Sequence, residues 1–221
     1  MTDATFSILV LTISVGFLST LLCLPFAIAI GYGLARGRLP MPSLIRAIVT
    51  LPMVMPPVAV GLVLLWLLGR SSPIAPFLEW LGVELVFTPA AAVVAAATVG
   101  FPLLARSAEQ SFAEIDPRYE EVARSLGSSR VATFFRVSLP LARRGLLYGG
   151  LLCFTRALGE FGATAVIAGI IPGKTETLSL GIWSRLQLGD DGGAASLVAL
   201  SFGVALVSMI AAERWLGPNR K

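Results

Sequence analysis

Long apolar segments separated by short charged ones set the pattern of this 221-residue chain. Four segments of more than 20 residues contain no Asp, Glu, Lys or Arg, and a fifth is interrupted only by Arg156 and Glu160. A helix of about 20 residues crosses the roughly 30 Å hydrocarbon core of a bilayer. The segments lack the alternation of barrel strands, which favours helices. The pattern predicts an all-α integral membrane protein, a single transmembrane domain over residues 1–221 with about five transmembrane helices, near residues 6–35, 45–69, 85–106, 144–171 and 193–213.

The composition supports a membrane protein and excludes several soluble classes. Hydrophobic residues make up 56% of the chain and charged residues 14%, whereas a soluble domain has about 25% charged residues. The chain contains no histidine, which excludes catalytic or metal sites built on imidazole. Cys23 and Cys153 lie in apolar surroundings and are interpreted as small buried residues. We expect no catalytic residue, no metal site and no cofactor in this chain.

The basic residues predict the orientation of the chain in the membrane. With the N-terminus outside and the C-terminus in the cytoplasm, inside segments contain 13 of the 17 Lys and Arg residues, as the positive-inside rule requires. These residues are Arg36, Arg38, Arg46, Arg106, Arg118, Arg124, Arg130, Arg136, Arg143, Arg144, Arg214, Arg220 and Lys221. The net charge of +4 is therefore a topological signal and predicts no nucleic-acid partner. The first apolar segment follows no basic residue and is longer than the roughly 7–15 residues of a signal peptide, so we expect a retained span.

Prolines interrupt several of the expected spans. Pro25 and Pro102 each remove a backbone hydrogen bond and are expected to kink their helices. A denser group, Pro52, Pro56 and Pro57, interrupts the start of the second span. Broken helices are tolerated at membrane depth where they face protein or a water-filled path. Two interpretations stay open for Pro56 and Pro57: a static kink, or part of a transport path.

The inner loop at about residues 107–143 predicts two short amphipathic helices. Asp116 is a suitable N-cap and Pro117 a suitable first helical residue. An apolar stripe follows, with i, i+3, i+4 and i+7 spacing, at Tyr119, Val122, Ala123 and Leu126. Gly127 is expected to end the first helix, Ser128 or Ser129 to cap the second, and Leu139-Pro140 to end it. The apolar face continues at Val131, Phe134 and Phe135. It needs a partner, which is either another protein or the bilayer surface.

The same loop resembles the EAA loop of ABC-importer permeases. Their pattern, Glu-Ala-Ala-x3-Gly-x9-Ile-x-Leu-Pro, matches Glu121-Val122-Ala123, Gly127, Val137 and Leu139-Pro140, with valine for alanine at 122 and for isoleucine at 137. The resemblance implies a type I ABC-importer fold and a cytoplasmic two-helix coupling loop that docks on a partner ATPase. The ATPase-coupling residues that it implies are Glu121, Ala123, Leu126, Gly127, Ser128, Ser129, Leu139 and Pro140.

Further segments resemble the molybdate permeases within that family. They are Leu51-Pro52 with residues 56–61, residues 156–163, and residues 171–178. The resemblance implies a permease that moves molybdate across the inner membrane by ATP-driven alternating access. It implies a homodimer, two cytoplasmic ABC ATPase subunits that bind the ATP, and a periplasmic or extracellular oxyanion-binding protein. Sulfate and tungstate permeases are related alternatives.

The two charges within the fourth span are candidates for the transport path. Arg156 and Glu160 are four residues apart, so on one helix face they can pair. Charges at membrane depth usually pair and face the bundle interior. The pair is either a structural lock or part of a path or gate where the Arg156 fork meets an oxyanion. Gly162 belongs to a run of small residues that favours close helix packing, within one subunit or between two. The outer loop at 171–193 is expected to lie at the membrane surface or fold back into the domain. The resemblance implies that it receives the binding protein, and a solvated loop with no partner is the alternative.

Two other classes of protein are disfavoured. An ion-coupled secondary transporter commonly shows internal repeats and several ionisable groups within the membrane, and neither is visible here. An intramembrane enzyme needs histidine or clustered carboxylates, which the predicted spans lack. The chain also lacks a Gly-x4-Gly-Lys-Ser/Thr phosphate loop, so ATP chemistry must come from another subunit.

Overall fold

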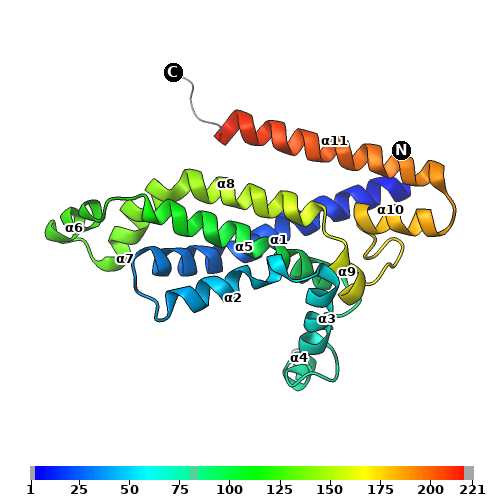
Figure 1. Ribbon diagram of the computed structural model, residues 1–221, viewed down its shortest axis with the longest axis horizontal. Helices are drawn as coiled ribbons and strands as arrows, with labels where there is room; N and C mark the ends of the chain where they lie inside the picture. The colour runs from blue at the N-terminus through cyan, green and yellow to red at the C-terminus, as the bar shows by residue number, and fades with distance from the viewer. Residues whose placement is uncertain (1–2, 81, 83, 217–221) are drawn as a thin grey trace.

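The computed structural model describes residues 3–80, 82 and 84–216, and all regular structure in this part of the chain is helical. Arg220 and Lys221, both predicted to lie inside, fall outside the described residues. Three helices, α1 (Asp3–Ala35), α5 (Pro89–Ala113) and α8 (Leu139–Leu158), form an elongated bundle (Figure 1). The other elements are α2 (Pro42–Val54), α3 (Pro57–Leu68), α4 (Ala75–Trp80), α6 (Pro117–Ser125), α7 (Arg130–Thr133), a π-helix η1 (Phe134–Ser138), α9 (Gly162–Ile167), α10 (Leu178–Gln187) and α11 (Asp191–Leu216).

Helix α5 is the centre of the bundle and packs through small residues. Its alanines at 91, 92, 95 and 96 are completely buried. A Cβ atom added at Gly31 of α1 would lie 2.8 Å from the Ala108 Cβ, and one at Gly149 of α8 would lie 2.6 Å from the Ser107 Cβ. Small residues let membrane helices approach closely and gain dispersion energy. The glycines of α1 and α8 therefore fix the spacing of the three central helices.

The predicted spans differ in whether a single helix is long and apolar enough to cross a membrane. Helices α1, α5 and α11 are each long and apolar enough to cross a membrane. Helices α2 and α3 qualify only as a pair, and they are bent by 112° at Met55 and Pro56. A break at this point was predicted from the prolines, and the bend is large because the Pro56 nitrogen carries no hydrogen to continue the ladder. That all five segments cross the membrane stays a prediction.

The fourth predicted span is not one helix. Helix α8 ends at Leu158, and the short α9 begins only at Gly162. The prediction that Arg156 and Glu160 pair is confirmed, but the two residues do not share one helix, since Glu160 lies in the break. A long apolar segment need not be one helix. Here the side chain of Glu160 accepts the hydrogen bond of the Ala163 backbone N–H and so satisfies a donor in the first turn of α9.

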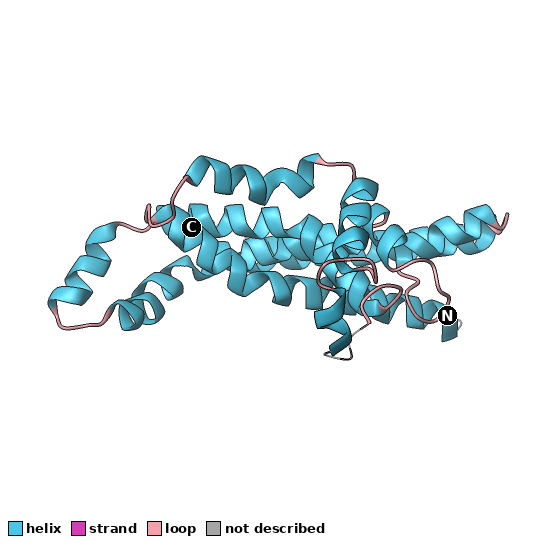
Figure 2. Cartoon of the chain, turned by 90° about the horizontal axis from the view of Figure 1, so that it is seen from below, coloured by secondary structure: helices cyan, strands magenta, loops and turns pink. Residues whose placement is uncertain are grey.

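The inner loop is shorter and more helical than predicted. Helix α5 continues to Ala113, so residues 107–113 belong to it. Leu139 and Pro140 do not end a helix but begin α8, because proline is tolerated in the first turn of a helix. Residues 130–158 are consequently one continuous helical rod made of α7, η1 and α8. Figure 2 shows, from a second direction, that the turn between α6 and α7 projects beyond one end of the bundle.

Candidate coupling segment and transport path

The coupling segment, residues 116–133, folds through local caps. The Asp116 carboxylate accepts the backbone N–H of Arg118 at 2.9 Å, and Pro117 begins α6. Gly127 has φ of +87°, a conformation that glycine adopts without strain. The Ser129 hydroxyl accepts the Ala132 N–H at 3.2 Å and caps α7. The predicted helix–glycine–helix arrangement is confirmed, with Ser129 as the second cap.

One face of the coupling segment is apolar and bare. Tyr119, Val122 and Leu126 of α6 are exposed, and Leu126 is 81% exposed. Val131 and Phe135 extend this face along α7 and η1. Glu121 is exposed beside it, and Ala123 and Ser128 are half-buried. Exposed apolar surface of this kind marks an interaction site. We call Tyr119, Val122, Leu126, Val131 and Phe135 the coupling stripe.

The opposite face of α6 is held by Glu120, which the sequence-based prediction missed. The Glu120 carboxylate is 2.9 Å from Arg36 Nη2, and it accepts hydrogen bonds from Ser138 Oγ at 2.8 Å and Tyr32 Oη at 3.2 Å. Burial raises the pKa of Glu120, but the hydrogen bonds from Ser138 and Arg36 and the Arg36 charge outweigh burial, so its pKa lies below its ordinary value. The sequence offered one indication of this contact: Arg36, at the end of the first predicted span, has no acidic residue near it in sequence and therefore needs a distant partner.

Aromatic rings reinforce this attachment. Tyr32 of α1 makes edge-to-face contacts with Phe112 of α5 and Phe134 of η1, with ring centroids 5.2 and 4.9 Å apart. Phe112 is completely buried. Arg36 also donates to the Ile115 carbonyl at 3.2 Å. The coupling segment is thus bound through Glu120 to Tyr32 of α1, Arg36 and Ser138 of η1 on one side, and it is bare on the other.

The predicted break between α2 and α3 lies against the break between α8 and α9, which the sequence did not predict. A Cβ atom added at Gly162 would be 2.8 Å from the Pro57 Cβ, and one at Gly61 would be 2.8 Å from the Ala163 Cα. The first turns of α3 and α9 therefore pack backbone to backbone. Pro56 and Pro57 remain exposed at this junction. The structure brings Pro57 and Gly162, which are distant in sequence, into one cluster.

The Arg156–Glu160 pair lies beside this junction. Arg156 Nη1 is 2.9 Å from Glu160 Oε2, and Glu160 Oε1 accepts the Ala163 N–H at 2.8 Å. Ser179 Oγ donates to the Glu160 carbonyl at 2.6 Å and ties the break to α10. Arg156 is one-third exposed and has no second partner among the described residues. Its other guanidinium donors are therefore available to an anion.

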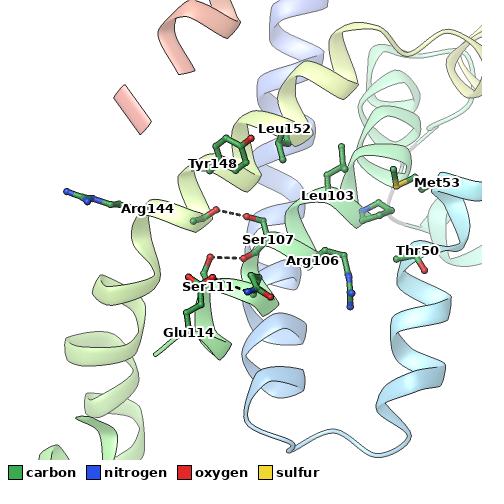
Figure 3. Close-up of a pocket in the computed structure, with 13 residues that line it drawn as sticks. Thr50, Met53, Leu103, Arg106, Ser107, Ser111, Glu114, Arg144, Tyr148 and Leu152 are labelled. Carbon is green, nitrogen blue, oxygen red and sulfur yellow. Dashed lines mark hydrogen bonds between the residues drawn. The ribbon is translucent and has the colours of Figure 1, made fainter. Parts of the chain in front are cut away.

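A cavity of about 560 Å³ lies between α2, α5 and α8, and its lining includes Met53 near the end of α2 (Figure 3). Ser107 at its floor donates to the Gly145 carbonyl at 2.8 Å. Arg106 and Arg144 point in different directions in Figure 3, so they do not converge on one anion site. Pro56, Pro57, Arg156, Glu160 and Gly162 do not line this cavity.

The outer loop folds back onto the bundle. Residues 178–187 form α10, whose Leu178 N–H donates to the Thr12 hydroxyl of α1 at 2.9 Å. Leu180 is completely buried. Arg185 Nη1 near the end of α10 lies 3.4 Å from Glu176 Oε1, which precedes the helix, so this ion pair links α10 to the loop before it.

The chain belongs to the family described as the binding-protein-dependent transport system inner membrane component, whose model matches residues 24–221. It is therefore a membrane subunit of this class of transporter. It is 37% identical over 218 residues to the molybdenum transport system permease protein ModB of Escherichia coli K12, covering 98% of this chain and 95% of that protein. It is 35% identical over 217 residues to the sulfate transport system permease protein CysW of Synechocystis, covering 97% and 79%.

Two solved structures share the fold. A chain of the inward-facing MetNI methionine ABC transporter superposes with a TM-score of 0.73 at 19% identity, covering 98% of both chains. A chain of a bacterial alginate ABC transporter, in complex with its alginate-bound periplasmic protein, superposes with a TM-score of 0.72 at 16% identity, covering 99% and 81%. The predicted type I ABC-importer fold is confirmed.

Proposed function

We propose that this chain is the permease of a molybdate importer and that ATP-driven alternating access moves the anion inward. The observation that carries the proposal is the similarity to ModB over nearly the full length of both chains. Two copies of the chain would form the path. Two cytoplasmic ABC ATPase subunits would bind and hydrolyse the ATP, and a periplasmic or extracellular oxyanion-binding protein would deliver the substrate. This chain has no phosphate-binding loop and contributes no ATPase site of its own.

The coupling stripe supplies the ATPase contact in this proposal. ATP-driven closure of the ATPase dimer displaces the stripe, which is apolar and bare as a docking face must be. Of the predicted coupling residues, Leu126 belongs to the stripe, Gly127, Ser128 and Ser129 form its turn, and Glu121 and Ala123 lie beside it on α6. Leu139 and Pro140 begin α8, and Leu139 packs against the core of the bundle. No ATP or other cofactor is assigned to this chain.

The junction of helix breaks is the proposed path or gate. Arg156, with donors left over from its pair with Glu160, offers a weak contact for a divalent oxyanion. One arginine already neutralised by Glu160 is too little for tight binding, and a path must release its substrate. Pro56, Pro57 and Gly162 allow α3 and α9 to separate and close, because few backbone hydrogen bonds cross the breaks.

Sulfate is the second candidate substrate because the chain also resembles CysW over 97% of its length. The test is uptake of labelled molybdate into vesicles that contain this chain, its ATPase and its binding protein. We expect ATP-dependent uptake that excess sulfate does not suppress. Full competition by sulfate would contradict the assignment of molybdate as the specific substrate but would leave the ABC-importer class unchanged. Uptake without any ATPase subunit would contradict the ABC-importer class itself.

The proposed orientation places the N-terminus outside and the coupling segment in the cytoplasm. Leu126 and Leu188 are almost equally exposed, at 81% and 80%, and the orientation places them on opposite sides. Single cysteines at these positions, with Cys23 and Cys153 replaced by alanine, can be probed in spheroplasts with a membrane-impermeant maleimide. We expect labelling at 188 and none at 126 until the membrane is permeabilised. The reverse pattern would invert the orientation.

A further inference from the structure

The buried carboxylate of Glu120 joins three parts of the inner end of the molecule. It belongs to α6, takes a charge-assisted contact from Arg36 and a hydrogen bond from Tyr32 of α1, and takes another from Ser138 of η1. Contacts of this kind are strong and directional, and inside a protein they fix one geometry. Glu121, its neighbour in sequence, is exposed.

The element that Glu120 grips leads without interruption to the candidate path. Ser138 ends η1, and α8 begins at the next residue and runs to Leu158, just before Glu160. The rod of residues 130–158 therefore carries Val131 and Phe135 of the coupling stripe near one end and Arg156 near the other, with Glu160 just beyond that end. A π-helical turn such as η1 is a weak point within a rod, because its hydrogen-bond geometry differs from that of the flanking α-helix.

We infer that Glu120 is a positioning residue that clamps α6 to α1 and to this weak point, so that displacement of the coupling stripe moves α8 instead of bending the coupling segment. The inference rests on the proposed function, because it assumes that an ATPase displaces the stripe. The clamp prevents α6 from rotating relative to α7 about the turn at Gly127. Without the clamp, ATP hydrolysis continues but drives less transport.

The decisive readout is the number of molybdate ions imported per ATP hydrolysed by the complex in proteoliposomes. Glu120→Gln keeps the size of the side chain and removes its charge. The matched control is Glu114→Gln at the end of α5, where the carboxylate is exposed and contacts only Gln110 among the described residues. Because coupling between sites is typically worth about 5–150-fold, we expect Glu120→Gln to lower the ratio about tenfold. Glu114→Gln should leave it unchanged.

A purely structural role would give a different result. Uptake and hydrolysis would then fall by the same factor as complex is lost, and the ratio would not change. That outcome overturns the inference. Absence of ATP-dependent uptake by the unsubstituted complex would instead overturn the proposed function, so the two failures are distinguishable.

A rescue experiment decides the matter even where Glu120→Gln assembles poorly. Arg36→Cys with Glu120→Cys, in a chain whose Cys23 and Cys153 are replaced by alanine, removes the clamp and leaves two thiols across it. We expect a low ratio before treatment and recovery toward the ratio of the cysteine-free parent after a short bifunctional thiol reagent joins them. A crosslinked complex whose ratio stays low contradicts a clamp that must remain closed during transport.

Discussion

Two buried glutamates, each paired with an arginine, lie in different regions of the molecule: Glu120 in α6 of the coupling segment, and Glu160 at the break between α8 and α9. Glu120 and Arg36 at the inner end are 7% and 9% exposed, whereas Glu160 and Arg156 at the helix breaks are 2% and 33% exposed. Arg36 also donates to Ile115, but Arg156 contacts only Glu160 among the described residues. The pair distances are the same, 2.9 Å. The exposure of the arginine, not the ion-pair distance, therefore distinguishes the two sites: the Arg36 guanidinium is enclosed, whereas that of Arg156 is one-third exposed.

The elements packed around the Arg36–Glu120 pair also differ from those around the Arg156–Glu160 pair. The inner pair is surrounded by aromatic rings and capped helices, which resist rearrangement. The outer pair lies where two short helix ends meet through Gly61 and Gly162. Segments with few continuous backbone hydrogen bonds open at lower free energy than capped helices. In the proposed mechanism, the region around Glu120 transmits a movement and the region around Glu160 undergoes one.

The largest effect is expected from Arg36→Ala. Removing one partner of a buried ion pair costs about 3–5 kcal/mol, because the remaining charge is left uncompensated. The control is Arg70→Ala, whose exposed pair with Glu84 should contribute about 0–1 kcal/mol. Thermal unfolding in detergent, followed by size-exclusion fluorescence, measures both. Equal losses in the two variants would contradict the clamp.

Gly162→Ala is expected to have the next largest effect. The added methyl would lie 2.8 Å from the Pro57 Cβ and 3.1 Å from the Val58 backbone nitrogen. Overpacking of this kind costs about 1–3 kcal/mol and should also slow uptake, since α3 and α9 must separate. Gly150→Ala is the control, because its methyl would meet only Thr20 at 3.6 Å. If both variants transport equally, close packing at the junction is irrelevant to function.

Arg156→Lys tests whether the outer pair meets the anion. Lysine keeps the charge for Glu160 but lacks the planar fork that binds oxyanions through two hydrogen bonds. Losing one such bond is worth about 1.4 kcal/mol, a roughly tenfold higher KM for the molybdate-loaded binding protein with little change in unfolding temperature. Initial uptake rates at varied concentrations of loaded binding protein give the KM. An unchanged KM would reduce the pair to a structural lock.

The smallest expected effect is the loss of the stabilising contribution of Glu120 at acidic pH. The pKa of Glu120 in the folded chain lies below its ordinary value of 4.5, so its stabilising contribution is complete above that pH and is lost as pH falls through the lowered pKa. The gap in unfolding temperature between the unsubstituted chain and Glu120→Gln should therefore be constant near neutral pH and should narrow in acid. A gap that widens on acidification would mean that the carboxyl is stabilised in its protonated form.

Features that depend on near neighbours in sequence were predictable. The Asp116 and Ser129 caps, the Gly127 turn and the break before Pro57 each follow from residues within one helical turn. Glu120 was missed because its partners Arg36 and Ser138 are 84 and 18 residues away. The end of α8 was missed because hydropathy reports the environment of a segment and not its backbone hydrogen bonds. The contact between Pro57 and Gly162 requires the fold itself.

The central claim is that a partner ATPase acts on the coupling stripe. Leu126→Asp and Leu188→Asp alter side chains of nearly equal exposure, 81% and 80%, at opposite ends of the proposed topology. The measurement is co-purification of the ATPase with each variant, together with ATP-driven molybdate uptake after reconstitution. The account predicts that Leu126→Asp loses both the ATPase and uptake, whereas Leu188→Asp retains the ATPase. A Leu126→Asp chain that keeps its ATPase and transports at the normal rate would contradict it.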